Sequence, residues 1–302
     1  MPVTGRAAGA NGFERMEASI RTCRFAETAI QFQSIGGSAR RLVQLLFGGL
    51  PRENRLPIRL TYQLVQDGGT YQVYRDGELA LNTPQEGVAA LHLLDGASRE
   101  FGGECSAGLV LRAACLAYRG KGLLLPGGAG CGKTTLAAWL IQAGFEYLTD
   151  ELVFLPWRQE GQAEWICQGF NRPLILTDSG VSLFQEAAVL ARTSGNRIDT
   201  PGGAIIPAAY FYKKAPLPVA PLHEIPLAGI IFPHFQMDAP LSFNPLSEAQ
   251  AAAGLLNCLV NADSLPGKGQ AAVERLSHWI PSFDLRYPRF LQVLPSIRKA
   301  LG

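Results

Sequence analysis

Several common signals are missing from this chain of 302 residues, and their absence narrows its class. The six cysteines are scattered without C-x-x-C spacing, and the four histidines are isolated from them. This pattern argues against a zinc site and against a disulfide framework. No apolar run approaches the roughly 20 residues that a membrane span needs, and the N-terminus lacks a charged-then-apolar signal pattern. We therefore expect a protein of the reducing cytoplasmic compartment with no membrane partner.

Charge is also scarce. Charged residues make up 17% of the chain, its formal net charge is +2, and it contains no Lys/Arg run or basic helix. Nothing in this balance favours nucleic acid as a partner. Hydrophobic residues make up 47% of the chain, so a sizeable core is expected. The length predicts about two domains of roughly 150 residues each.

The first third of the chain predicts a small β-rich module. Residues 1–20 are interpreted as a loose tail. The runs "CRFAETAIQFQ", "IRLTYQLVQ" and "TYQVYRDGELALN" are strand-like, and turn signals at Asp67 and Asp76 predict β-hairpins. "SARRLVQLLFGGLP" predicts a short helix that ends at Gly48. Residues 21–104 are assigned to this module, whose role its composition does not indicate.

The pattern then becomes α/β, and residues 105–302 are assigned to a second domain. "AGLVLRAACLAY" is suited to a buried element. "GLLLPG" is a short continuous apolar run, as expected of a buried strand in a parallel sheet. "KTTLAAWLIQAG" predicts a helix capped by Gly144.

The segment between that strand and that helix predicts a phosphate-binding loop. Gly127, Gly132, Lys133 and Thr134 fit the pattern G-x-x-x-x-G-K-[ST] at every fixed position. Glycines let the backbone curve so that successive N–H groups point at phosphate oxygens. Lys133, expected to face solvent, would neutralise the β- and γ-phosphates, while Thr134 would bind Mg²⁺.

The loop predicts ATP and Mg²⁺ as cofactors. The predicted nucleotide-binding residues are Gly127, Gly128, Ala129, Gly130, Cys131, Gly132, Lys133, Thr134 and Thr135. Cys131 is interpreted as a small residue that the loop uses through its backbone, rather than as a redox sensor.

An acid pair, Asp150 and Glu151, follows Lys133 by seventeen residues in "FEYLTDELVFLP". In an open parallel sheet, the carboxyl end of this strand would lie beside the phosphate-binding loop. A carboxylate there could bind Mg²⁺ or accept a proton from an attacking hydroxyl. The alternative is a surface turn with two solvated acids.

The segment 110–155 resembles the catalytic core of the HPr kinase/phosphorylase superfamily. It is most similar to the HPr-kinase-related proteins, which include kinases of lasso-peptide precursors. The resemblance rests on "LRAACLAYRGKGLLLPGGAGCGKTTLAAWLIQAGFEYLTDEL". It implies a P-loop kinase domain of HPr-kinase type, with Lys133 and Asp150 as catalytic residues and Asp150 activating the acceptor hydroxyl. Thr134 and Glu151 are the implied metal residues. "WIPSFDLRYPRFLQVLPSIRKAL" resembles the closing strand and helix of that group.

Two departures from the family pattern limit what the resemblance implies. Arg112 stands where the family usually carries a histidine, so a reverse, dephosphorylating reaction is not expected. The later acidic-Arg-Gly signature is missing, so HPr is not expected as the substrate. Three pairs of charged residues could contact substrate or metal, but we expect them to be solvated in loops. They are Arg172 with Asp178, Arg197 with Asp199, and Lys213 with Lys214.

The predicted fold is thus α/β, a P-loop kinase domain with a β-rich N-terminal module. The predicted function is transfer of the γ-phosphate of ATP to a hydroxyl. A serine of a peptide or protein is the favoured acceptor, and a small molecule such as free serine is the alternative acceptor. Assembly into a homo-oligomer is a further possibility that the sequence leaves open. The alternatives are a nucleotide-binding regulatory or assembly ATPase without phosphotransfer, and a phosphate-binding structural module with an inert acid pair.

Overall fold

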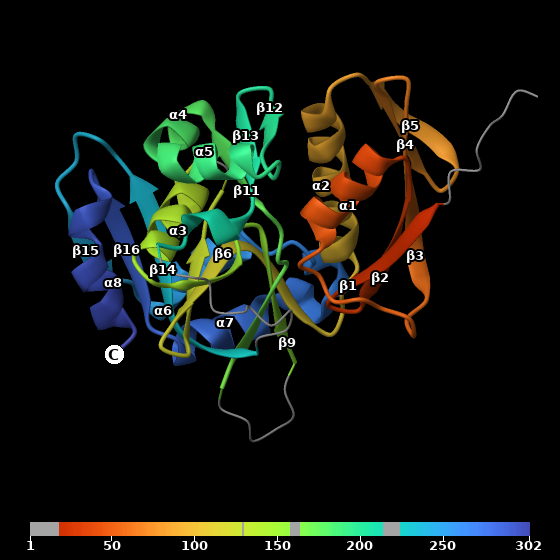
Figure 1. Cartoon of the computed structure of the whole chain (residues 1–302). Coiled ribbons are helices and arrows are strands. Elements are labelled where there is room, and N and C mark those ends of the chain that lie inside the picture. The colour runs from red at the N-terminus through yellow and green to blue at the C-terminus, as the bar shows by residue number, and fades with distance from the viewer. Residues whose placement is uncertain (1–17, 129, 158–163, 214–223) are drawn as a thin grey trace, which may run out of the picture.

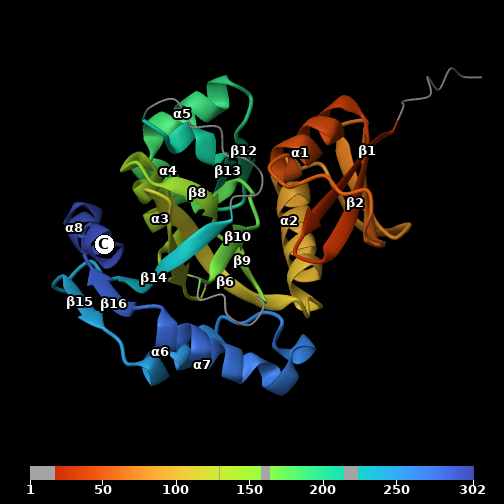
Figure 2. The same cartoon turned by 90° about the horizontal axis from the view of Figure 1, so that it is seen from below.

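The computed structural model describes residues 18–128, 130–157, 164–213 and 224–302. These residues form a mixed α/β protein with three sheets. An N-terminal part lies beside a larger α/β body in both views (Figures 1 and 2). Most of the predicted tail, residues 1–17, lies outside the described residues.

The N-terminal part is a five-stranded sheet in the order β1-β2-β3-β4-β5, with two helices on the face toward the body (Figure 1). Both predicted hairpins are confirmed: β3 pairs with β4, and β4 pairs with β5. The second turn uses positive φ at Asp76 and Gly77, 48° and 88°, as tight hairpin turns require. The elements are β1 Ser19–Phe25, β2 Thr28–Ile35, α1 Gly37–Phe47, β3 Ile58–Asp67, β4 Thr70–Arg75, β5 Glu78–Thr83 and α2 Glu86–Gly103.

Helix α2, with 18 residues, is an addition to the predicted β-rich module. Its apolar residues recur at helical spacing, and Leu93, Ala97 and Phe101 are fully buried. The predicted helix α1 is confirmed, with Gly48 as its C-cap.

The largest sheet has the order β10-β9-β6-β7-β14-β16-β15, and β8 pairs with β6 beside β9. Strand β10 also pairs with β14, so the first five strands close on themselves. Strand β7 is parallel to β14 but antiparallel to β6. The prediction that β7 lies in a parallel sheet is therefore correct for its β14 neighbour and wrong for its β6 neighbour. The strands are β6 Gly108–Tyr118, β7 Lys121–Pro126, β8 Glu146–Thr149, β9 Leu152–Pro156, β10 Ile166–Gly169, β14 Ile225–Phe235, β15 Ser242–Pro245 and β16 Ser282–Tyr287.

Helices cover both faces of this sheet. Because side chains alternate along a strand, Ala114 and Leu116 of β6 pack on the side of α3 and α8, while Ala113 and Cys115 pack on the side of α6 and α7. The predicted helix after the loop is confirmed as α3, followed by Gly144 at φ +93°. The helices are α3 Lys133–Gln142, α6 Glu248–Leu256, α7 Gln270–Trp279 and α8 Leu294–Ala300.

A small third sheet in the order β11-β13-β12 lies next to α3 with two short helices. Its elements are β11 Leu174–Thr177, α4 Asp178–Leu183, α5 Gln185–Thr193, β12 Ile198–Thr200 and β13 Gly203–Ile206. The remaining elements are 3₁₀ turns: η1 Ala208–Phe211, η2 Ala262–Ser264, η3 Pro266–Gly269 and η4 Phe290–Gln292.

One aromatic cluster joins the N-terminal part to the body. The ring of Phe25 lies 6.4 Å from that of Phe154 and 5.6 Å from that of Phe170. Phe101 of α2 lies 5.5 Å from Phe170. The core of the N-terminal part therefore includes side chains of the body.

In the part of the chain that the structure describes, no helix is both long and apolar enough to cross a membrane. All six cysteines are free thiols; five are buried and Cys131 is partly exposed.

Candidate active site

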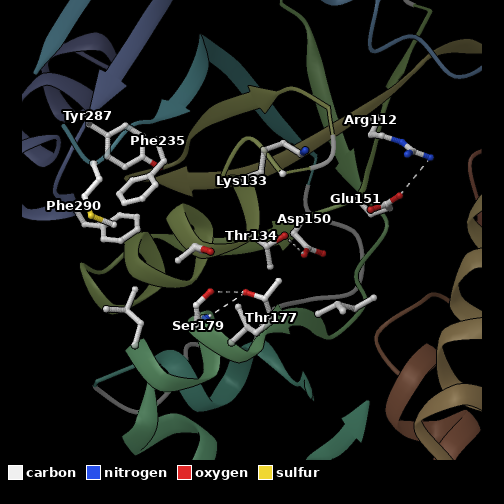
Figure 3. A pocket seen from close by; sticks show the side chains of 18 residues that line it. Arg112, Lys133, Thr134, Asp150, Glu151, Thr177, Ser179, Phe235, Tyr287 and Phe290 are labelled. Atoms are coloured by element: carbon white, nitrogen blue, oxygen red, sulfur yellow. Dashed lines mark hydrogen bonds and ion pairs between the residues drawn. The ribbon is translucent and has the colours of Figure 1, made fainter. Parts of the chain in front are cut away.

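A cavity of about 650 Å³ lies at the end of β7. Its lining comes from the predicted phosphate-binding loop, the junction of β8 and β9, β11 and the start of α4, and the ends of β14 and β16 (Figure 3). Elements distant in sequence therefore meet at one cavity.

The register of β6 explains why the acid pair lies level with the loop. Ala113 of β6 pairs with Pro126, the last residue of β7, on one side. On the other side, the Ala113 N–H donates to the Glu151 carbonyl oxygen at 3.0 Å. The predicted closeness of loop and acid pair thus arises through β6, an antiparallel strand between them, rather than through adjacent parallel strands.

Glycine is needed in the loop where other side chains come close. Gly132 has φ +92°, a conformation that side-chain-bearing residues rarely adopt. A Cβ there would lie 3.3 Å from Cβ of Phe235 and 3.4 Å from the Tyr287 hydroxyl. The loop is therefore packed against the ends of β14 and β16, and α3 begins at the next residue.

The expectation that Lys133 faces solvent is wrong, because this residue is only 9% exposed. Its ammonium group donates to the carbonyl oxygens of Gly127 and Gly128, both at 2.7 Å. Cys131 Sγ lies 3.7 Å from the same nitrogen. The lysine is held inside the loop, where it lines the cavity.

Asp150 is a buried carboxylate with three donors. Thr134 Oγ1 donates to its Oδ2 at 3.0 Å, which connects the loop directly to the acid pair. Tyr147 Oη and Arg172 Nε both donate to Oδ1, each at 3.1 Å. Burial, with the Asp150 charge as the next cause, raises the pKa of Tyr147 well above its usual value, so this hydroxyl remains a donor.

Both acids line the cavity, but Glu151 differs from its neighbour in exposure, because 22% of its side chain is exposed against 0% for Asp150. Arg172 Nη2 donates to its Oε2 at 3.0 Å. The Arg112 guanidinium, half-exposed, lies 3.7 Å from Oε1. The acid pair therefore has one inner and one outer carboxylate (Figure 3).

The expectation that Arg172 is solvated in a loop is wrong: its side chain is 7% exposed and bridges both acids. Its segment is tied to the acid-bearing strand in two places. The single Tyr147 hydroxyl proton is shared between Asp150 Oδ1 and the Arg172 carbonyl oxygen, which lies 3.0 Å from Oη, and Thr149 Oγ1 donates to the Phe170 carbonyl oxygen. Burial lowers the pKa of Arg172, but the charges of Asp150 and Glu151 outweigh it and raise the pKa above the usual value.

The other candidates fall elsewhere. Asp178 opens α4 without lining the cavity. Asp199 forms ion pairs with the exposed Arg192 and with Arg197, whose side chain is only 14% exposed, so the expected solvation does not hold for Arg197. Lys213 is exposed. Ala129 and Lys214 lie outside the described residues.

Part of the cavity lining carries no signal in the sequence. Thr177 and Ser179 share a hydrogen bond of 3.0 Å at the start of α4. Phe235, Tyr287 and Phe290 line the opposite end of the cavity from the acid pair (Figure 3). These residues form no motif, and only the places of Thr177, Phe235 and Tyr287 at the ends of strands could have suggested this part of the lining.

The donors at the site fit Mg²⁺ carried by a nucleotide. In the described residues no three His, Cys, Asp or Glu side chains gather as a ready metal cage. The Thr134 hydroxyl and the acid pair are hard oxygen donors, and Mg²⁺ typically binds one or two carboxylates together with substrate phosphates.

No protein-family model and no curated protein matches this chain. Among solved structures, the Hpr(Ser) kinase/phosphatase from Coxiella burnetii matches with a TM-score of 0.31 and 14% sequence identity. The match covers 63% of this chain and 94% of that chain. At this TM-score the likeness decides neither the arrangement of the site nor its chemistry.

Proposed function

We propose that the protein is an ATP-dependent kinase that transfers the γ-phosphate to a hydroxyl group. The observation that carries the proposal is the hydrogen bond between Thr134 and Asp150, 3.0 Å long. It joins the hydroxyl expected to bind the metal to a pair of carboxylates in the same cavity. This is the arrangement that phosphoryl transfer uses to position a metal and a nucleophile together.

Lys133 and the loop would bind the triphosphate. The ammonium group lies among carbonyl oxygens, and phosphate oxygens entering the loop would offer it stronger, charge-assisted partners. Bound Mg²⁺ would neutralise the developing charge on the β- and γ-phosphate oxygens. Thr134 would hold this metal, and Asp150 would hold the Thr134 hydroxyl in position.

The two carboxylates differ enough to suggest separate roles. Asp150 accepts three hydrogen bonds and is 1% exposed, so an acceptor hydroxyl has poor access to it. Glu151 faces the cavity, which suits a group that orients the acceptor or takes its proton. We propose that Glu151 acts on the acceptor and Asp150 supports the metal, the reverse of the division that the family resemblance implies.

The first experiment is transfer from γ-labelled ATP to a panel of serine-containing peptides and to free serine, followed by mass spectrometry. The proposal predicts a phosphorylated acceptor and one ADP for each phosphate transferred. Mg·ATP binding by calorimetry without transfer to any acceptor would instead favour the regulatory or assembly ATPase.

The second experiment separates the acids, with Asp178→Asn as a control carboxylate outside the cavity lining. Glu151→Gln should keep Mg·ATP binding and slow transfer by about 10²–10⁴-fold, the usual range for general-base assistance. Asp150→Asn should mainly raise the Mg²⁺ concentration needed for half-maximal rate. A loss of transfer in Asp150→Asn at saturating Mg²⁺, with near-normal transfer in Glu151→Gln, would restore the assignment of Asp150 as the base.

A further inference from the structure

Three aromatic side chains gather at the end of the cavity away from the acid pair, and we call them the aromatic end: Phe235, Tyr287 and Phe290. The rings of Phe235 and Phe290 are nearly parallel, 5.8 Å apart with an interplanar angle of 8°. Tyr287 meets Phe235 edge to face at 5.6 Å. Phe235 is 42% exposed, which is unusual for a phenylalanine at the end of a central strand.

The topology places the aromatic end on one side of the phosphate-binding loop and the acid pair on the other. Strands β14 and β16 run parallel to β7, and Phe235 and Tyr287 are their last residues. The acid pair approaches from the opposite side of β7, beyond β6. A triphosphate in the loop with its γ-phosphate toward the acids would therefore have its nucleoside toward Phe235.

Tyr287 provides an independent sign of a ligand. It is fully buried, and its hydroxyl has no hydrogen-bond partner among the described residues, a rare condition in folded proteins. This oxygen lies against the loop, 3.4 Å from where a Cβ on Gly132 would be. Burial, together with the nearby Cys131, raises the Tyr287 pKa, so the phenol remains a neutral donor at physiological pH.

We propose that the aromatic end is the nucleoside subsite of the cavity. The base stacks on the exposed ring of Phe235, backed by Phe290, and the Tyr287 hydroxyl donates to a phosphate oxygen bound by the loop. Aromatic faces stack on bases irrespective of their identity. An apolar acceptor side chain is the poorer occupant, because the acceptor has to approach the γ-phosphate at the acid pair. This inference rests on the proposed function, since it assumes that the loop binds a nucleoside triphosphate.

The test compares Mg·ATP with inorganic triphosphate, which has no base, by calorimetry on the full chain. Phe235→Ala should weaken Mg·ATP binding by roughly 5- to 150-fold, the range for losing one base–aromatic stack. Binding of inorganic triphosphate should stay within about twofold of the wild-type value. Tyr287→Phe keeps the ring but removes the donor, so it should weaken both ligands by similar factors.

Trp279→Ala, an exposed aromatic on α7, is the matched control and should change neither affinity. Phe235→Leu keeps apolar volume without an aromatic face, so it serves if the alanine variant does not fold. Unchanged Mg·ATP affinity in folded Phe235 variants, or equal losses for both ligands, would overturn the subsite. A wild-type protein that binds neither ligand would instead overturn the proposed function itself, and the subsite with it.

Discussion

At the scale of single residues, Arg172 is the side chain on which the acid pair depends most. It is 7% exposed and is bonded to both carboxylates. Arg172→Met should therefore lower the free energy of unfolding by about 3–5 kcal/mol, the usual result of leaving a buried charge unpaired. Urea unfolding followed by circular dichroism measures the loss.

Arg192→Met is the matched control, because the Arg192–Asp199 pair is about 60% exposed on both sides and should contribute less than ~1 kcal/mol. Adding Asp150→Asn to Arg172→Met should recover part of the stability, since the uncompensated charge is then removed. Equal losses in the two arginine variants would show that the bridge to the acids is not structurally important.

Residues joined by a contiguous motif were predictable, and those joined only by folding were not. Lys133 and Thr134 belong to a spaced pattern with a physical reason for each position, and the structure places both at the cavity. Arg172 looks the same in sequence whether solvated or buried. Tyr287 shows no role in sequence, because its significance comes from the unpaired hydroxyl beside the loop.

At the scale of elements, α2 packs against the first sheet too closely for an ordinary side chain at Gly96. A Cβ there would lie 2.2 Å from the Tyr62 hydroxyl. Gly96→Ala should thus destabilise the protein by about 1–3 kcal/mol, although alanine is the better helix former. Gly103→Ala is the control, because no described atom lies within 4 Å of its Cβ position. A more stable Gly96→Ala protein in thermal melts would show that Tyr62 moves aside freely.

The same helix gives a pH dependence through His92. Burial lowers its pKa, and the positive charge of Arg99 lowers it further. The unfolded chain then binds a proton at higher pH than the folded one, so the contribution to stability is complete above about pH 6.5 and falls as the pH drops below it. His92→Gln should reduce the loss of melting temperature between pH 7.5 and pH 5.5. An identical loss in the variant would assign that pH dependence to other groups.

Sequence patterns identified elements well where periodicity or turn chemistry was strong, as in the hairpin at Asp76 and the helix α3. The helix α2 was missed although Leu93, Ala97 and Phe101 recur at helical spacing, because the glycines within it are poor helix formers and hide the pattern. The direction of β6 was missed because a buried apolar strand reads the same in parallel and antiparallel pairing.

At the scale of the whole molecule, the shared aromatic cluster predicts that the two parts unfold together. Phe25 is 4% exposed and contacts Phe154 and Phe170 of the body. Phe25→Ala should cost about 3–5 kcal/mol and lower the melting temperature of the entire chain. Scanning calorimetry should show a single transition for both proteins. Two transitions, with only one shifted in the variant, would mean that the parts are energetically separate.

The break between β8 and β9 has a consequence for how this protein could be recombined. One long strand, β6, pairs with both β8 and β9. Asp150 and Glu151 lie between these two strands, where the pairing of β6 changes from β8 to β9. On the β9 side, Leu152 and Phe154 belong to the core of the N-terminal part. A chimera that replaced the chain up to the end of α2 with another N-terminal part would keep every motif residue. Leu152 and Phe154 would then pack against side chains for which they are not matched. A successful graft would have to exchange the phenylalanines on both sides of the junction as one matched set.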